Sequence, residues 1–378
     1  MLAKWACKQM AAVARFISFF KPRPIPRVAF LVHTPELFNH FEPIWEHLKS
    51  EQFDVLLLGD ALCCEETAAR MVGINVRQVS DVLAARDRYQ VLVSNHPVNL
   101  TGQDTPRGKQ LLIKKLAVTN LRMMYAAGKS GWNMSDWNKF YDGVLCFGPH
   151  HARIFSKKFG LPVMEIGYPR FDRYFNDPLD ISELQRRFFC NPEKSTIVWL
   201  PTWKTLSSVD HFNSEITSLL SDYNVVVKVH PLMPESEPSR VKALEKLGFN
   251  SLISDARDNV PLYQLADYML FDYGGPAFGG IYTSKRFVLL NVPQAENDLL
   301  TGRDSPDILL RRDVLNVNPG EGALRPLLQD DSHWDRQNAV IKRLRRDYFA
   351  ENFGTSAASA AQAITDLSWL GRKGGPRW

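Results

Sequence analysis

The chain has 378 residues, of which 45% are hydrophobic and 23% are charged, and its formal net charge is +5 at pH 7. That length exceeds one ordinary core and predicts a globular protein of two domains. The small charge and the lack of any RNA- or DNA-reading motif exclude a dedicated nucleic-acid binder. No apolar run reaches the roughly 18–20 residues that a membrane span needs.

The five cysteines predict neither a disulfide framework nor a zinc site. They are odd in number and lack Cys-x-x-Cys spacing. Reduced thiols in a cytoplasmic protein are the simplest interpretation. The sequence therefore gives no sign of secretion.

Residues 1–26 form a segment of their own. Apolar residues between positions 2 and 20 recur at helical spacing among lysines and arginines, and no acid precedes Glu36. This pattern is typical of a basic amphipathic helix that lies on a membrane surface, followed here by a proline-rich linker. A helix that packs on the protein's own body and a targeting segment are the two alternatives.

Residues 27–170 are expected to form an N-terminal Rossmann-like domain that binds the acceptor. Apolar strand segments alternate with helical segments there, which predicts a parallel sheet. Strands are expected at 27–32, 54–58, 76–79, 90–93, 143–147 and 163–166. Helices are expected near 42–51, 65–71, 81–86 and 149–159. The stretch 101–137 is polar and basic, and no element is predicted in it.

Residues 171–350 repeat the alternation and are expected to form the nucleotide-donor domain. Strands are expected at 196–200, 224–229, 251–253, 268–271 and 287–292. Helices are expected near 213–220, 239–247, 260–265 and 334–347. Residues 351–378 then supply a small-residue helix and a tail. The predicted fold class is α/β, with two Rossmann-like domains facing a cleft.

Two strand ends of the second domain carry the strongest chemical signal. One strand ends in Lys228 and His230, and another runs into Gly274 and Gly275 before a helix-like segment. Ligands of open α/β sheets collect at such carboxyl ends, and bare glycine amides can approach phosphate oxygens. His230, with an ordinary pKa near ~6.5, is the candidate general base. A structural loop histidine and tight strand-to-helix packing are the alternatives.

Further candidates follow other strand ends. Thr202, Trp203 and Lys204 come after the strand at 196–200 and offer a hydroxyl, a ring and a point charge for a phosphate. Packing at the hinge is the other interpretation of Trp203. Arg170, at the turn between the domains, either clamps a phosphate or makes an interdomain ion pair.

The remaining candidates are an acid, a phenol and several histidines. Asp272 and Tyr273 precede the glycine pair, where ribose and base contacts often sit. His33, His40 and His96 are expected just beyond strands of the first domain, facing the same cleft, and His33 and His96 are its candidate catalytic residues. A structural role is the alternative for each of them taken alone.

No metal or other cofactor is expected. The histidines have no His-x-x-x-His or His-Glu-x-x-His spacing, and no Asp-x-Asp pair is present to hold a metal-bound nucleotide. His150 and His151 open the helix at 149–159 and are expected to be surface or cap residues.

Several segments, in this order, resemble the CDP-glycerol glycerophosphotransferase family, the GT-B-type enzymes that build teichoic acids and related capsule or O-antigen polymers. They are Tyr-Asp-Gly-Val-Leu at 141–145, Gly-Tyr-Pro-Arg-Phe-Asp at 167–172, Leu-Pro-Thr-Trp-Lys at 200–204, Lys-Val-His-Pro at 228–231, Val-Pro-Leu-Tyr-Gln-Leu-Ala-Asp at 260–267, Asp-Tyr-Gly-Gly at 272–275 and the helix after 353–354. The resemblance covers roughly residues 120–367.

The resemblance implies an activity. A hydroxyl of a glycan or lipid-linked acceptor attacks the β-phosphate of CDP-glycerol, and CMP leaves. It implies a catalytic His230, with Arg170, Thr202, Lys204, Gly274 and Gly275 near the diphosphate. Family members use membrane-bound acceptors, so the resemblance also implies a protein that sits peripherally on the inner face of the cell membrane.

Three departures from the family pattern leave other functions open. Ala127 stands where the family has the histidine of a His-Gly pair, Gly274 and Gly275 replace paired serines, and Gly279 replaces an aspartate. A nucleotide-sugar-dependent GT-B glycosyltransferase of capsule or lipopolysaccharide synthesis is the first alternative. A non-catalytic relative that binds an envelope glycan or scaffolds a complex is the second.

Overall fold

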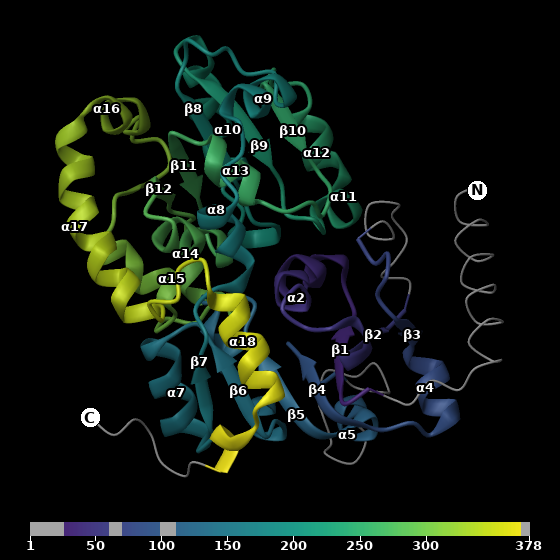
Figure 1. The fold of residues 1–378 in the computed structure, drawn as a ribbon. Helices are drawn as coiled ribbons and strands as arrows, with labels where there is room; N and C mark the ends of the chain where they lie inside the picture. Colours follow the sequence, from purple (N-terminus) through teal and green to yellow (C-terminus); the bar gives the residue numbers. More distant parts are fainter. Residues whose placement is uncertain (1–25, 60–69, 99–110, 372–378) are drawn as a thin grey trace.

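The computed structural model describes residues 26–59, 70–98 and 111–371. The expected helix over residues 1–21 lies outside these ranges, as do residues 65–69 of the one near 65–71. Two parallel sheets, each with helices packed around it, make up the described part of the chain (Figure 1). The predicted α/β class is therefore confirmed. The boundaries at residues 27, 171 and 351 stay predictions.

The first sheet has the strand order β3-β2-β1-β4-β5-β6-β7 within the described residues, and all its pairings are parallel. Its strands are β1 (Val28–Val32), β2 (Phe53–Leu57), β3 (Val76–Gln78), β4 (Tyr89–Ser94), β5 (Ala117–Met123), β6 (Gly143–Cys146) and β7 (Val163–Glu165). The order reverses between β1 and β4, which makes the loops after these strands the place where a ligand of this sheet is expected.

The second sheet has the order β10-β9-β8-β11-β12-β13, again parallel throughout. Its strands are β8 (Thr196–Leu200), β9 (Asn224–Lys228), β10 (Ser251–Ile253), β11 (Tyr268–Phe271), β12 (Arg286–Leu290) and β13 (Asn316–Val317). Here the reversal lies between β8 and β11. The Thr-Trp-Lys segment follows one of these strands and the glycine pair follows the other, so both flank the predicted ligand position.

Helices cover both sheets and connect them. They are α2 (Phe38–Trp45), α4 (Val79–Ala85), α5 (Leu112–Leu116), α6 (Ser130–Asn133), α7 (Pro149–Phe159), α8 (Asp172–Asn176), α9 (Ile181–Arg187), α10 (Val209–Ser218), α11 (Met233–Ser236), α12 (Pro238–Leu244), α13 (Val260–Leu265), α14 (Gly275–Tyr282), α15 (Pro306–Leu309), α16 (Leu324–Gln329), α17 (Asp331–Tyr348) and α18 (Ser356–Thr365). None of the helices in the described ranges combines the length and the apolar character needed to cross a membrane.

The chain crosses back to the first sheet at its end. The helix α17 lies along the second sheet, whereas α18 packs on the first, where its alanines join the apolar core formed by β1, β2 and α2 (Figure 1). The carboxylate of Asp172 accepts hydrogen bonds from Ser356 N–H at 3.1 Å and from Ala357 N–H, and so caps the start of α18. The C-terminal segment therefore ties the two sheets together.

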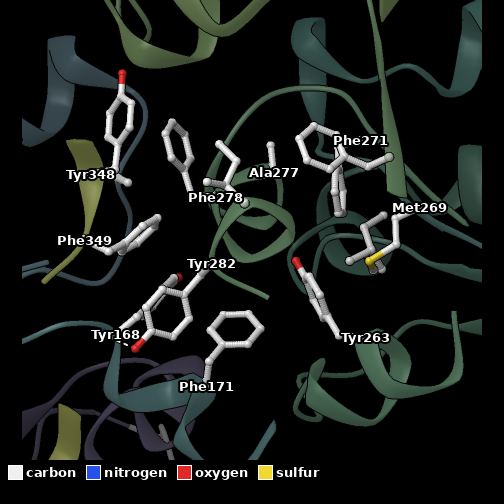
Figure 2. Close-up of a cluster of buried hydrophobic side chains, with 14 of the residues drawn as sticks. Tyr168, Phe171, Tyr263, Met269, Phe271, Ala277, Phe278, Tyr282, Tyr348 and Phe349 are labelled. Atoms are coloured by element: carbon white, nitrogen blue, oxygen red, sulfur yellow. Dashed lines mark hydrogen bonds between the residues drawn. The ribbon is translucent and has the colours of Figure 1, made fainter. Parts of the chain in front are cut away.

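An aromatic cluster fills the junction on the side of α14. Figure 2 shows Tyr168 and Phe171 from the turn between the domains packed against Tyr282 of α14 and Phe349, which follows α17. These side chains belong to one core that also contains residues of both sheets. Because protein cores are close-packed, this side of the junction is held rigidly.

The structure corrects the predicted elements around the first sheet at residues 101–137 and 42–51. The stretch 101–137, for which no element was predicted, contains the strand β5, which pairs with β4 and β6 and whose Arg122 is fully buried. The helix expected near 42–51 begins earlier, at Phe38, and ends at Trp45. His40 consequently lies inside α2 and is buried, and not in a loop that faces the cleft.

Candidate active site

The loops after β8 and β11 are joined through one buried carboxylate. Asp272 accepts hydrogen bonds from Thr202 N–H at 2.9 Å and from Tyr273 N–H at 2.7 Å. It also accepts from both the N–H and the hydroxyl of Ser208 at 2.9 Å. The carboxylate is therefore fully used inside the protein. Asp272 shapes the loop that presents Thr202, and it is not placed to contact a ribose.

Tyr273 is also directed into the protein. Its side chain packs with Leu206 and Val292 in a small apolar cluster, and the guanidinium carbon of Arg311 lies 3.8 Å from its ring centroid. Arg311 in turn donates to the carbonyl of Asp272 at 2.6 Å. Tyr273 thus supports the strand end, and the structure does not expose its ring for a nucleobase.

His230 lies beside Trp203, as the two strand ends predict. The two rings stack with centroids 5.1 Å apart and an interplanar angle of 9°, and the Lys204 amine lies 4.1 Å from the Trp203 ring centroid. His230 Nδ1 accepts a hydrogen bond from Leu232 N–H at 3.2 Å. A neutral ring with Nδ1 as acceptor carries its proton on Nε2.

The electrostatic environment keeps His230 neutral. Burial and the positive charges of Lys129 and Lys228 lower the pKa of His230 to about 3. The resulting Nε2–H group is suited to donate to a phosphoryl oxygen. This geometry favours a hydrogen-bond donor over the expected general base, for which Nε2 would need a free lone pair.

Lys228 brings a buried ammonium to the same strand end. Its side chain is 4% exposed. Burial lowers its pKa, and the nearby Glu36 and Asp258 counteract that effect. Within the described residues, no hydrogen bond or ion pair to its Nζ is found. A buried cation without a direct partner is costly, and an anionic ligand would remove that cost.

The glycine turn is only partly free to bind an anion. Gly274 has φ = +114°, a conformation that favours glycine, and its N–H donates to Asp307 Oδ1 at 2.7 Å. The amide of Gly275, the first residue of α14, has no such carboxylate partner among the described residues. A bound phosphate would therefore meet Gly275 N–H, whereas Gly274 is engaged with Asp307.

Arg170 makes the interdomain ion pairs that were the alternative to a phosphate clamp. Its Nη1 lies 2.6 Å from Glu36 Oε1 of the first domain, and its Nε lies 2.9 Å from Asp258 Oδ1 of the second. His40 Nε2 is 3.3 Å from the same Nη1. The Arg170 side chain is 7% exposed, so it acts mainly as a buried link between the domains.

In the first domain, His33 and His96 come together at the reversal of the strand order. Their ring centroids are 6.5 Å apart, and His96 stacks on Trp132 at 5.0 Å. Burial, together with the neighbouring His33 and Arg122, lowers the pKa of His96 to about 4, and burial also lowers that of His33. His96 Nδ1 accepts from Val98 N–H at 3.2 Å. Neither ring nitrogen of His33 has a hydrogen-bond partner in the described part of the chain.

One of the two histidines at the start of α7, His151, differs from the prediction, whereas His150 is partly exposed. His151 is fully buried, not a surface or cap residue, and its Nε2 lies 3.2 Å from the carbonyl oxygen of Ala127. Ala127 is itself buried. Ala127 therefore lies beneath the surface, with the His151 imidazole packed behind it.

Two residues of this region, Lys129 and Asp307, were missed as site residues. The amides of Lys129 and Gly274, which belong to different domains, both donate to the Asp307 carboxylate. The sequence showed Lys129 only as one of the positive charges of the stretch 101–137, and no pattern in it singled out Asp307. No three His, Cys, Asp or Glu side chains of the described residues are grouped as a metal ion would require.

Two parallel sheets whose carboxyl-end loops meet across a junction are the architecture of GT-B-like transferases, and solved structures of this class share it. The wall teichoic acid polymerase TagF is 16% identical, with a TM-score of 0.63 over 91% of this chain and 89% of that one. HepE from Anabaena, solved with UDP and glucose, is 13% identical, with a TM-score of 0.56 over 90% of this chain and 100% of that one. These similarities establish the fold.

The family itself follows from the sequence match. The model of the CDP-glycerol:poly(glycerophosphate) glycerophosphotransferase family matches residues 80–284, more than half of the chain. The chain belongs to this family and is a transferase of that class. Among individual proteins of curated function, none matches it in sequence.

Proposed function

We propose that this enzyme transfers glycerol phosphate from CDP-glycerol to a hydroxyl group of a cell-envelope glycan or glycolipid and releases CMP. The observation that carries the proposal is the grouping of Lys228, His230 and the Gly275 amide at the carboxyl edge of the second sheet. A diphosphate is the ligand whose charge and hydrogen-bonding needs match such a group.

On the donor side, each group has a separate task. Lys228 supplies positive charge, His230 donates from Nε2, and Thr202 and Lys204 border the same strand end. Asp272 holds Thr202 in place through its backbone. Phosphoryl transfer depends chiefly on positioning and on stabilising negative charge, which such groups provide.

On the acceptor side, His33 is the candidate base. Burial keeps its imidazole neutral, and its ring nitrogens are free of hydrogen bonds within the described residues. It can therefore accept the proton of an attacking hydroxyl. His96, whose Nδ1 is occupied by Val98 N–H, orients the acceptor by donating from Nε2.

The reaction balances without another reactant. The acceptor oxygen forms a bond to the β-phosphorus of CDP-glycerol, and the bond from that phosphorus to the bridging oxygen breaks. The bridging oxygen leaves as part of CMP, and the hydroxyl proton passes to His33 and then to water. The product is a phosphodiester between glycerol and the acceptor.

The acceptor and the cellular location remain part of the proposal. A membrane-bound glycan or glycolipid is inferred because the family builds envelope polymers and because residues 1–21 carry a basic amphipathic pattern. Peripheral attachment to the inner face of the cell membrane follows from the same pattern. Deleting residues 1–21 should abolish sedimentation with anionic liposomes while the melting temperature stays nearly constant.

A donor panel tests the proposed reaction. The enzyme is incubated with CDP-glycerol, CDP-ribitol, UDP-sugars and CMP-sugars, and both the released nucleotide and the acceptor product are identified by mass spectrometry. CMP release with a gain of glycerol phosphate on the acceptor is expected from CDP-glycerol alone. Turnover of a nucleotide sugar in its place would reject the proposal.

A nucleotide-sugar-dependent GT-B glycosyltransferase is the second candidate. The observation that favours it is Ala127, since the family's first-domain histidine is missing and Gly279 replaces its aspartate. The same donor panel decides between the two functions, because a sugar donor would leave a glycosidic linkage and no phosphodiester in the product.

A further inference from the structure

Lys129 extends from the first domain to the glycine turn of the second. It follows β5, whereas Gly274 follows β11. A methyl group placed on Gly274 would lie 3.6 Å from Lys129 Cε and 4.0 Å from its Nζ. The ammonium group of one domain thus lies at the proposed phosphate position of the other.

The backbone of Lys129 is fixed by the second domain. Four consecutive amides of the first domain donate to the segment around α15, which lies at the junction in Figure 1. They are Lys129 N–H to Asp307 Oδ2, Ser130 N–H to Ser305 Oγ at 3.1 Å, Gly131 N–H to the Thr301 carbonyl at 3.1 Å and Trp132 N–H to the Leu300 carbonyl at 3.1 Å.

Small residues make this close approach possible. A methyl group on Gly128 would lie 2.3 Å from Asp307 Oδ2, and one on Gly131 would lie 2.1 Å from the Leu299 carbonyl oxygen. Both distances are far below van der Waals contact, so neither glycine tolerates a side chain without movement of the junction. Lys129 adopts φ = +52° between them. The backbone position from which the Lys129 side chain extends is therefore determined by the fold.

The ammonium itself is available for a ligand. Among the described residues, no hydrogen bond or ion pair to Lys129 Nζ is found. The positive charge of Lys129 also acts on His230 more strongly than that of Lys228 does. The Lys129 ammonium therefore lies beside the glycine turn, and its charge and that of Lys228 both act on His230. No carboxylate of the described residues pairs directly with either ammonium group.

We propose that Lys129 is a catalytic residue that contacts the transferred phosphoryl group of the donor from the side of the first domain. This role of Lys129 deepens the proposed function. It rests on that function only in requiring a donor that carries a diphosphate. As the acceptor oxygen approaches, negative charge develops on the phosphoryl oxygens, and an ammonium fixed beside them stabilises it.

This role fits the chain's departure from its family. With Ala127 in place of a histidine, the first domain has no imidazole at that position to face the diphosphate. Lys129, two residues later, supplies a permanent charge in its place. Asp307 is a positioning residue, because it holds the Lys129 amide and the Gly274 amide with one carboxylate.

The test compares nucleotide affinities of the wild type and Lys129→Met by isothermal titration calorimetry with CMP, CDP and CDP-glycerol. Loss of one charged contact should weaken CDP and CDP-glycerol by on the order of 10–100-fold. The affinity for CMP, which lacks the β-phosphate, should change far less. Lys129→Arg should restore part of the loss, because it keeps the charge.

Lys139→Met is the matched control. It removes one exposed lysine from the same part of the first domain and should leave all three affinities unchanged. Melting temperatures show whether each variant is folded. Equal affinity of the wild type and Lys129→Met for CDP would overturn the proposal, as would an equal loss for CMP and CDP.

The outcomes also separate this inference from the proposed donor. Should the wild type bind UDP nucleotides and not CDP nucleotides, the proposed donor is wrong, and the same comparison with UMP and UDP then tests Lys129. Should the wild type bind neither nucleotide diphosphate nor inorganic diphosphate, both proposals fail.

Discussion

The Asp307 carboxylate accepts a hydrogen bond from Gly274 N–H at 2.7 Å, and its other oxygen accepts from the amide of Lys129. The two amides belong to loops of different sheets. Ser305 Oγ donates to the same carboxylate at 2.8 Å. One buried side chain, 2% exposed, therefore fixes the distance between the two halves of the candidate site.

Asp307→Asn should weaken this link. An asparagine presents one oxygen and one NH₂ group to partners that are all donors, so at least one buried amide loses its acceptor. We expect the free energy of unfolding to fall by about 1–3 kcal/mol and the KM for the donor to rise. Urea unfolding and steady-state kinetics measure these changes.

Asp304→Asn is the control for this variant, because Asp304 is exposed in the loop just before α15. It should behave as the wild type in both assays. An Asp307→Asn enzyme with unchanged stability and unchanged KM would show that the carboxylate does not determine the geometry of the junction.

Arg170→Met should be among the most destabilising substitutions at the junction. It leaves the carboxylates of Glu36 and Asp258 partly buried and without their cation. Breaking a buried pair costs roughly 3–5 kcal/mol, and the lower end applies because both carboxylates keep some contact with water. Chemical unfolding gives the value.

Arg173→Met provides a matched comparison, because Arg173 lies three residues further along the chain, is 40% exposed and pairs with Glu46. An exposed pair contributes at most about 1 kcal/mol. If both variants lose the same small amount, the Arg170 cluster is not an important interdomain link. A raised donor KM in Arg170→Met with unchanged stability would support the phosphate-clamp role instead.

The strand ends that carry the candidate site were visible in the sequence because strands of a parallel sheet are near-continuous apolar runs. The segments preceding His33, His96, Thr202, His230 and Gly274 all show this pattern. Since parallel strands place their carboxyl ends at one edge, the sequence could also predict that these residues gather there.

The strand β5 could not be found in this way. Its Arg122 is fully buried, and its guanidinium donates to the Asn133 carbonyl at 2.7 Å and to Asn138 Oδ1 at 2.5 Å. The ring of Trp137 lies 4.5 Å from the guanidinium carbon. These partners follow between residues 133 and 138, so the sequence around Arg122 did not show that it belongs to a buried strand.

The contact between Lys129 and Asp307 could not be predicted from the sequence either. The two residues are 178 positions apart, and neither belongs to a motif. Only the folded chain shows that the loop after β5 docks on the segment around α15. Residues that act across a domain junction are hard to infer because sequence patterns report mainly local structure.

Gly279→Ala tests whether α14 has room for a side chain at this position. Figure 2 shows Phe171 and Tyr263 close to α14, and a methyl group on Gly279 would lie 2.5 Å from Phe171 Cζ and 2.6 Å from the Tyr263 hydroxyl. Overpacking of this kind costs about 1–3 kcal/mol, whereas glycine to alanine within an unobstructed helix is stabilising. We expect the melting temperature of Gly279→Ala to be lower than that of the wild type. A higher melting temperature would show that α14 has space for a side chain at this position.

Stability should fall as the pH is lowered from about 6.5 toward 4. Burial lowers the pKa of His96 and His150 to about 4 and that of His151 and His230 to about 3. In the unfolded chain these histidines titrate near ~6.5. Between the two values the unfolded state binds the extra protons, so the free energy of unfolding decreases with decreasing pH and is unaffected by these groups above pH ~7.

His151→Gln isolates one of these protons. The fully buried imidazole should contribute a slope of about 1.4 kcal/mol per pH unit below its unfolded pKa, and glutamine removes that contribution while keeping a donor for the Ala127 carbonyl. Urea unfolding at several pH values between 5 and 7.5 gives the slopes of both proteins, and contributions from all other groups cancel in the difference. Parallel slopes would mean that His151 takes up its proton in the folded state and is not held neutral by burial.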